Sequence, residues 1–235
     1  MRIRRMFIPA LLIAVPWAAS AQEGAGPDLL ETLERSMTGA IEQAERSVVA
    51  IARVRKAQPG ETFPLEFRPD PFGRRLAPAP APQPTDPDFI PSAYGTGVVV
   101  DARGLILTAN HVLQEDSEYY VTTHDRKVYQ AWVKGADPRS DLAILAIEAG
   151  NLLPIRFGDG AKVRRGQLVI ALGNPYAIAR DGQFSASWGI VSNLARKAPP
   201  SPNEFDSSGR DTLHHFGTLI QTDVRLTLGA SGGPL

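Results

Sequence analysis

Three residues that lie far apart in the sequence have the side chains that acyl transfer requires. Ser231 stands among glycines in the segment 229–235 (GASGGPL), where the backbone can approach a substrate closely and direct N–H groups at one point. A serine hydroxyl attacks a carbonyl when a base takes its proton and a third group holds that base in the right tautomer. We expect His111 to be the base and Asp141 to be the group that orients it.

His111 and Asp141 both lie next to predicted strands. His111 belongs to the segment 108–112 (TANHV), which follows directly on a strand, and Asp141 precedes the apolar run 142–147. Rigid elements position a side chain better than loops do. Each residue taken alone also fits an ordinary structural role, such as a tight turn or a satisfied histidine at the core edge. The interpretation therefore depends on the set and on its surroundings.

Short apolar and β-branched runs dominate the chain from residue 47 onward, and turn residues separate them. The first set comprises residues 47–54, 97–100, 105–108, 119–123, 129–133 and 142–147, and the second comprises residues 155–157, 167–172, 184–192 and 218–222. Helices do not alternate with these strands, which disfavours a parallel α/β sheet. We therefore predict an all-β fold with two antiparallel barrels, the first in residues 47–150 and the second, incomplete, in residues 151–235.

The N-terminal part of the chain has a different pattern. Residues 1–21 combine three arginines, a short apolar run and the sequence ASA, which together are typical of a signal peptide cleaved near Ala21. The apolar run is too short for a stable membrane span. Apolar residues at three-to-four spacing then predict a helix from Asp28 to Glu45, within an N-terminal helical segment formed by residues 22–46.

Two further stretches lack the pattern of strands. Residues 57–93 are rich in proline, which cannot supply a ladder of hydrogen bonds, so we expect a long exposed loop. Residues 195–216 are polar and contain proline, and we expect a second long connection there.

Composition and charge exclude several classes of protein. The chain has 25 basic and 25 acidic residues, and loss of the three arginines of the signal peptide leaves an acidic excess, so we expect no nucleic-acid partner. It has no cysteine, so packing rather than disulfide bonds must stabilise it in an oxidising compartment. His124, His214 and His215 lie in polar contexts and are expected at the surface. The adjacent pair lacks the spacing of zinc ligands, so no metal and no organic cofactor is expected.

An ordered set of motifs resembles the HtrA/DegP family of trypsin-like serine proteases over residues 41–235. The segments 108–112 (TANHV), 137–143 (DPRSDLA) and 229–235 (GASGGPL) are similar to that family's histidine, aspartate and serine motifs. Other similar segments are YGTGVVV at 94–100, GNP at 173–175, GIVS at 189–192 and QTD at 221–223. One such motif would be weak evidence, whereas the set in one order is specific.

The resemblance implies a chymotrypsin-like fold of two barrels and a role for each residue of the site. It makes His111 the general base and later the acid, Asp141 its orienting partner and Ser231 the nucleophile. It also makes the backbone amides of Gly229 and Ser231 the oxyanion hole. The residues before the serine, Thr227, Leu228 and Ala230, would form part of the substrate pocket.

By the same resemblance the protein would be an exported serine-type endopeptidase. It would hydrolyse unfolded or damaged polypeptides as part of periplasmic protein quality control and the stress response. The resemblance further implies a homo-oligomer built from trimers, with the loop 57–93 in oligomer contacts or regulation. The localisation would be periplasmic or secreted.

The chain departs from the family pattern before the serine and at its end. The family usually has an Asn-Pro pair where Thr227 and Leu228 stand here, and Asn where Ala230 stands. Family members also continue with strands that close the second barrel and then with peptide-binding PDZ domains, none of which lies within this chain. We therefore expect a fragment, truncated just after the serine motif. If Leu235 were the natural terminus, we would expect an inactive or poorly folded protein.

Two other functions fit part of the sequence. The segment 229–233 also fits the G-x-S-x-G pattern of α/β-hydrolases, which would make the protein an esterase, but that fold expects the acid and the histidine after the serine. The chain would alternatively be a noncatalytic polypeptide-binding or chaperone-like module on a protease scaffold, given the missing barrel closure and the altered residues Thr227 and Leu228.

Overall fold

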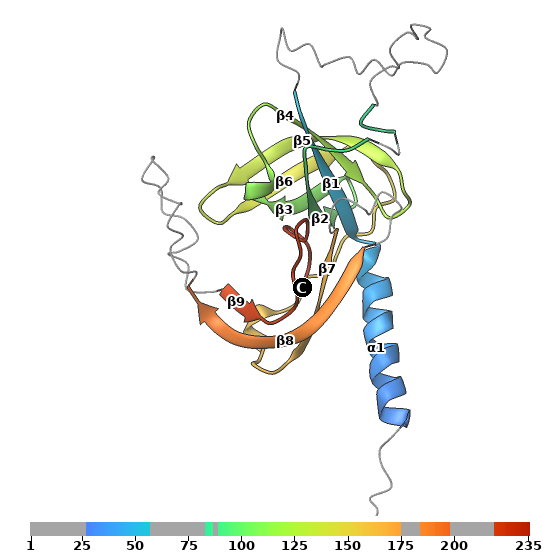
Figure 1. Ribbon diagram of the computed structural model, residues 1–235, viewed down its shortest axis with the longest axis vertical. Coiled ribbons are helices and arrows are strands. Elements are labelled where there is room, and N and C mark those ends of the chain that lie inside the picture. Colours follow the sequence, from blue (N-terminus) through green and yellow to red (C-terminus); the bar gives the residue numbers. More distant parts are fainter. Residues whose placement is uncertain (1–26, 57–82, 87–88, 175–183, 198–218) are drawn as a thin grey trace, which may run out of the picture. The chain divides into compact units, whose positions relative to one another are not determined.

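The computed structural model describes residues 27–56, 83–86, 89–174, 184–197 and 219–235 (Figure 1). Its internal contacts divide the chain into two compact units, Met1–Ser36 and Met37–Leu235. The expected signal peptide, residues 1–21, and most of the expected loop 57–93 lie outside the described residues.

Helix α1, Pro27–Glu45, forms where the spacing of apolar residues predicts it. In the first unit the leucines near the start of the helix are exposed, as Leu30 is at 69%. In the second unit Ile41 and Ala44 pack against a buried cluster of strand residues. The part of the chain that the structure describes contains no helix long and apolar enough to cross a membrane.

Six strands form a closed antiparallel barrel. They are β1 (Val48–Arg55), β2 (Ala93–Asp101), β3 (Leu105–Ala109), β4 (Ser117–Thr122), β5 (Val128–Asp137) and β6 (Leu142–Ile147). Their order is β1-β2-β3-β6-β5-β4, and β1 closes the barrel because it pairs with both β2 and β4. Closure leaves no unpaired strand edge and encloses a core in which Ile51, Ile106 and Leu145 are fully buried.

A second, smaller antiparallel sheet follows in the chain. It consists of β7 (Leu168–Gly173), β8 (Ser185–Arg196) and β9 (Leu219–Thr222), in the order β7-β8-β9. Val48 and Val98 of the barrel form a buried cluster with Leu172 of β7, which attaches this sheet to the barrel. Among the described residues, two short 3-10 turns complete the regular structure, η1 (Asn110–Val112) and η2 (Gly160–Lys162). The described fold is therefore mostly β, with one closed barrel and a second partial one, as the sequence predicts.

The predicted strand over residues 155–157 does not form. Ile155 meets the barrel through its N–H, which donates to the carbonyl oxygen of Val99 at 2.8 Å, but the segment as a whole is not a strand. Pro154 has no N–H to donate, and glycines at 158 and 160 follow, so a longer ladder of hydrogen bonds is not sustained.

The bounds of several other elements also differ from expectation, most clearly those next to the two expected loops. Strand β8 continues to Arg196, so residues 195 and 196 belong to the strand and not to the expected connection. Most of that connection lies outside the described residues. Strand β2 begins at Ala93, which was expected to end the proline-rich loop. In both cases the strand extends because a neighbouring strand pairs with it, Ala93 with Arg53 and Arg196 with Leu219.

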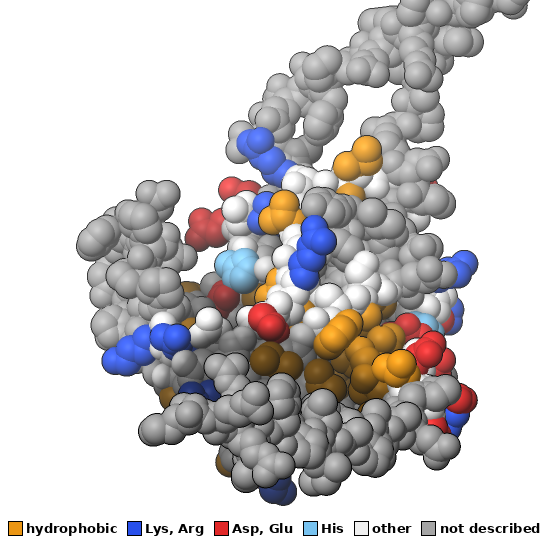
Figure 2. Space-filling view, turned by 60° about the horizontal axis from the view of Figure 1, so that its bottom comes forward, with side chains coloured by type: hydrophobic (Ala, Val, Ile, Leu, Met, Phe, Trp, Pro, Cys, Tyr) orange, Lys and Arg blue, Asp and Glu red, His pale blue; other side chains and the backbone are white. Residues whose placement is uncertain are grey.

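The surface seen in Figure 2 carries charges of both signs. Acidic and basic side chains are interspersed among the described residues on this face, and hydrophobic side chains gather in one patch. No single sign of charge dominates the described residues there, which agrees with the near balance of acidic and basic residues in the sequence.

Candidate active site

The pairing of β3 with β6 brings His111 and Asp141 together. In this antiparallel pair Ala109, the last residue of β3, lies opposite Leu142, the first residue of β6. The chain after β3 and the chain before β6 are therefore neighbours. The N–H of Asn110 donates to the carbonyl oxygen of Asp141 at 2.9 Å, and the N–H of His111 donates to Asp141 Oδ1 at 2.8 Å.

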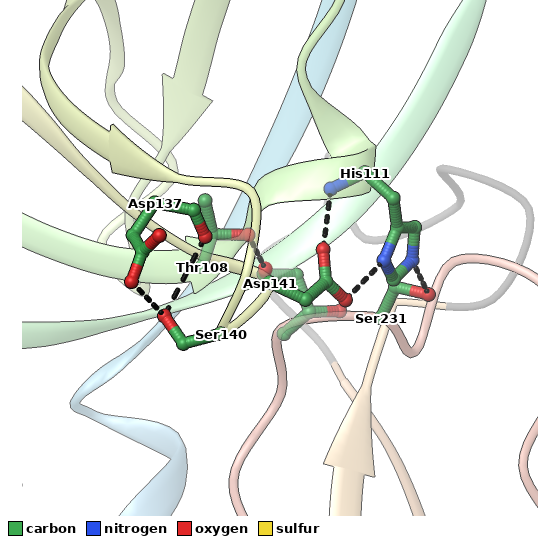
Figure 3. Close-up of polar contacts among 7 residues, drawn as sticks. Thr108, His111, Asp137, Ser140, Asp141 and Ser231 are labelled. Carbon is green, nitrogen blue, oxygen red and sulfur yellow. Dashed lines mark hydrogen bonds and ion pairs between the residues drawn. The ribbon is translucent and has the colours of Figure 1, made fainter. Parts of the chain in front are cut away.

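The side chains of Asp141, His111 and Ser231 form a continuous line of hydrogen bonds (Figure 3). The distance from His111 Nδ1 to Asp141 Oδ2 is 2.6 Å, and the distance from His111 Nε2 to Ser231 Oγ is 2.9 Å. A carboxylate only accepts hydrogen bonds, so Nδ1 carries the proton of the neutral ring and Nε2 is left as an acceptor. The hydroxyl of Ser231 therefore donates to Nε2.

Asp141 has a backbone conformation that few residues adopt. Its φ is 54°, in the left-handed region that asparagine and aspartate tolerate better than most other residues. The preceding turn, which starts in β5, leads the chain into this conformation. In that turn the hydroxyl of Ser140 donates to Asp137 Oδ2 at 2.9 Å, and this hydrogen bond, followed by one from the backbone N–H of Arg139, lowers the pKa of Asp137.

The site is open to solvent on the histidine side. The side chain of His111 is 58% exposed and that of Asp141 is 20% exposed. A reactant can therefore reach the ring of His111, while the carboxylate that orients the ring is more sheltered.

Glycines on both sides of Ser231 allow the loop that carries it to pack closely on the rest of the molecule. We call residues 227–234 the serine loop. Gly229 and Gly232 have φ values of 95° and 84°, which side chains other than glycine rarely adopt. A Cβ atom at Gly229 would collide with the carbonyl oxygen of Asn174, and one at Gly232 with that of Thr96. These contacts fix the serine loop against β2 and the end of β7.

Two backbone N–H groups of the serine loop are left available. Within the described residues no acceptor pairs with the N–H of Gly229 or of Ser231. The N–H between them, that of Ala230, donates to the carbonyl oxygen of Thr227 at 3.0 Å. The loop therefore leaves free the two amides expected to form an oxyanion hole.

A pocket of about 220 Å³ lies beside the serine loop. Thr227 and Ala230, both expected to contact substrate, line it together with residues of β7 and β8. Leu228, the third residue expected there, is 72% exposed and is not part of the pocket wall.

The other histidines are not brought to this site. His124 is exposed in the turn between β4 and β5, and His214 and His215 lie outside the described residues. Where the structure describes the chain, His, Asp and Glu side chains form no group of three or more that could hold a metal ion.

One residue that contacts the serine loop was not expected from the sequence. Thr96 of β2 is fully buried, and its hydroxyl donates to the carbonyl oxygen of Gly229 at 2.6 Å. In the sequence it is a threonine between two glycines, and because threonine is common in strands, local sequence gives no clear signal of this contact.

Comparison with known proteins gives a family and several relatives. Residues 95–235 match the family model described as a trypsin-like peptidase domain, and this range contains all three residues of the hydrogen-bonded line. A relative from Chlamydia muridarum (strain MoPn / Nigg), named probable periplasmic serine endoprotease DegP-like, is 31% identical over 240 residues, which cover 95% of this chain and 44% of the relative. A protein of the same name from Ectopseudomonas mendocina (strain ymp) is 33% identical over 247 residues, which cover 100% of this chain and 46% of that relative.

A solved structure is similar as well. The HtrA-type protease AlgW with a decapeptide has a TM-score of 0.58 and 28% sequence identity, with 83% of this chain and 54% of that chain covered. The chain spans less than half the length of the two relatives named above.

Proposed function

The chain belongs to the family of trypsin-like peptidases, with relatives of the DegP and HtrA type, and from this premise we propose that it is the catalytic part of an exported serine endopeptidase. The substrates would be unfolded or damaged polypeptides. The observation that carries the proposal is the line of hydrogen bonds from Asp141 through His111 to Ser231.

In the proposed mechanism each member of this line has a defined role. Ser231 Oγ attacks the carbonyl carbon of the scissile peptide bond while His111 Nε2 takes the hydroxyl proton. His111 then gives that proton to the leaving amine, which completes acyl transfer to the serine. Asp141 holds the ring in the tautomer in which Nε2 is free to accept, and it stabilises the imidazolium that forms.

The serine loop supplies the groups that meet the substrate. The amides of Gly229 and Ser231, for which the described residues provide no acceptor, would donate to the oxygen that becomes negative in the tetrahedral intermediate. Thr227 and Ala230 would contact the substrate from the wall of the pocket beside the loop. Leu228 would take part only by moving, because it now lies exposed outside that wall.

The cellular setting follows from the relatives and from the N-terminal sequence. Relatives are named periplasmic endoproteases, and residues 1–21 have the pattern of a signal peptide. We therefore propose a periplasmic location and a role in protein quality control and the stress response. A homo-oligomer built from trimers is proposed from the family resemblance alone. No metal or organic cofactor enters the proposed mechanism.

Cleavage of casein, an unfolded protein, tests the proposal. We expect the wild-type chain to degrade casein and the Ser231→Ala variant to lose at least about a thousandfold in rate, because the nucleophile is gone while the fold is kept. Circular dichroism of both proteins checks that the fold is unchanged. Equal turnover by the two proteins would exclude the serine mechanism.

A further inference from the structure

Thr96 connects three separate parts of the chain through one residue. Its hydroxyl donates to the carbonyl oxygen of Gly229 at 2.6 Å and accepts the N–H of Asn174 at 2.9 Å. Its own N–H donates to the carbonyl oxygen of Ser231 at 2.8 Å, and its carbonyl oxygen accepts the hydroxyl of Thr108 at 2.7 Å. Strand β2, the end of β7 and the serine loop therefore meet at this residue.

These hydrogen bonds fix the peptide groups around the nucleophile. The peptide group between Gly229 and Ala230 is held at both ends, by the hydroxyl of Thr96 at its carbonyl and by the carbonyl of Thr227 at its N–H. The next peptide group contains the free N–H of Ser231, and its carbonyl, that of Ala230, accepts the N–H of Gly233 at 3.0 Å. The direction of the Ser231 N–H is thus set by neighbours that Thr96 holds in place.

From this arrangement we infer that Thr96 is a positioning residue for Ser231. Its hydroxyl holds the serine loop in the conformation in which the Ser231 Oγ reaches His111 Nε2 and the Ser231 N–H stays free. The inference rests on the proposed function for its effect on rate, but the hydrogen bonds themselves are independent of it.

The inference depends on the hydroxyl of Thr96, because this side chain and its neighbour Asn174 are buried away from solvent. Thr96 is 0% exposed and Asn174 is 1% exposed, so water does not replace a lost partner. A valine at position 96 would have nearly the same shape but would remove the hydroxyl that binds the carbonyl of Gly229 and the N–H of Asn174. Loss of a hydrogen bond to a buried group is costly, and the serine loop would shift in response.

The test compares variants of the full chain in their reaction with a fluorophosphonate probe, which forms a covalent adduct with an activated serine. The maximal rate of inactivation, kinact, reports the chemistry at Ser231, and the inhibition constant KI reports binding of the probe. We expect Thr96→Val to lower kinact by about 10- to 100-fold, the range that a small misplacement of a catalytic group produces, with KI changed by less than about twofold. Thr96→Ser keeps the hydroxyl and should restore kinact to within about threefold of wild type.

Thr123→Val is the matched control. Thr123 is also buried, at 3% exposure, and its hydroxyl lies 2.5 Å from Asp125 Oδ1 and 3.1 Å from the carbonyl oxygen of Lys127. Thr123→Val therefore removes a buried threonine hydroxyl, with partly buried hydrogen bonds to exposed partners, at a place that has no contact with the serine loop. We expect Thr123→Val to have the same kinact as the wild-type protein. A drop equal to that of Thr96→Val would overturn the inference, as would wild-type kinact in a folded Thr96→Val.

Amide hydrogen exchange separates this inference from the proposed function. In Thr96→Val the amides of Asn174 and Ala230 should exchange faster, while the amides shared between β5 and β6 should keep their wild-type rates. If the wild-type chain is not labelled by the probe, the proposed function fails, and the exchange rates alone decide the role of Thr96. Unchanged exchange at Asn174 and Ala230 would overturn it. If Thr96→Val does not fold, Thr96→Cys, which forms much weaker hydrogen bonds, replaces it and must show the same loss relative to Thr96→Ser.

Discussion

The carboxylate of Asp141 binds His111 twice, and each oxygen has its own task. Oδ1 accepts the backbone N–H of His111 at 2.8 Å and Oδ2 binds the ring nitrogen Nδ1 at 2.6 Å. The first contact fixes the position of the His111 backbone. The second fixes the orientation of its ring and which ring nitrogen carries the proton. Both depend on the backbone of Asp141, whose φ of 54° aims the side chain at the ring.

Replacing Asp141 by asparagine tests the tautomer directly. Asparagine also tolerates a positive φ, and its amide oxygen can still accept the backbone N–H of His111. Its NH₂ group would then face Nδ1 as a donor, so the ring proton moves to Nε2, which can no longer accept the proton of Ser231. We expect casein cleavage by Asp141→Asn to fall by about 10³- to 10⁴-fold with the fold intact.

Asp101→Asn provides the control for this substitution. Asp101 is the last residue of β2 and pairs with Arg103 at 2.7 Å, with no contact to His111. The activity of Asp101→Asn should therefore equal that of wild type. If Asp141→Asn kept more than about a tenth of wild-type activity, the orienting role of Asp141 would be wrong.

The sequence contains enough to select His111, Asp141 and Ser231, because their side-chain types are those that acyl transfer needs and their motifs follow one order. Their roles in catalysis remain predictions. Thr96 could not be selected in the same way, because a threonine in a strand is an ordinary residue with high strand propensity. What sets it apart is the docking of the serine loop on β2, and this long-range contact is not encoded in local spacing.

At the scale of elements, the turn between β5 and β6 leads the backbone into the positive φ of Asp141. Figure 3 shows the hydrogen bond from Ser140 to Asp137, which spans this turn, and Asp141, which follows Ser140 in the chain. The hydrogen bond from Ser140 is the largest cause of the lowered pKa of Asp137. The turn is therefore more stable when Asp137 is ionised.

This coupling predicts a pH-dependent effect of Ser140→Ala. Because the folded-state pKa of Asp137 lies below its ordinary value of 3.8, the hydrogen bond stabilises the fold above that pH, and the stabilisation is lost as the pH falls through the lowered pKa. We expect Ser140→Ala to lower the urea midpoint at neutral pH by a small amount, since Asp137 is at the surface. As the pH falls below the lowered pKa of Asp137, the two midpoints should converge. A difference that persisted or grew in acid would contradict this account of the turn.

Much of the secondary structure could be predicted from the sequence, because helix α1 and the barrel strands have clear apolar periodicity. The family, which was identified from ordered motifs, is confirmed by the match over residues 95–235. The prediction of a strand over residues 155–157 was wrong. A short apolar run between a proline and glycines does not show whether a partner strand is present to pair with it. The order of the barrel strands could not be read either, because it depends on pairing between β1 and β4 and between β3 and β6.

At the scale of the whole described unit, the reactive groups come from two sheets. His111 and Asp141 belong to the closed barrel, and Ser231 follows β9 of the second sheet. The cluster of Val48, Val98 and Leu172 and the contacts of Thr96 with the serine loop hold these parts together. The site therefore exists only when both sheets are folded and packed, so its reactivity reports the integrity of the unit.

The most direct test of the central claim is the site and rate of fluorophosphonate labelling, followed by peptide mass spectrometry, in wild type and His111→Ala. The account predicts one adduct, on Ser231, in the wild-type chain and a rate lower by at least about a thousandfold in His111→Ala, because the hydroxyl loses the base that lies 2.9 Å away. An adduct on another residue, no labelling of the folded wild-type chain, or equal rates in the two proteins would contradict it.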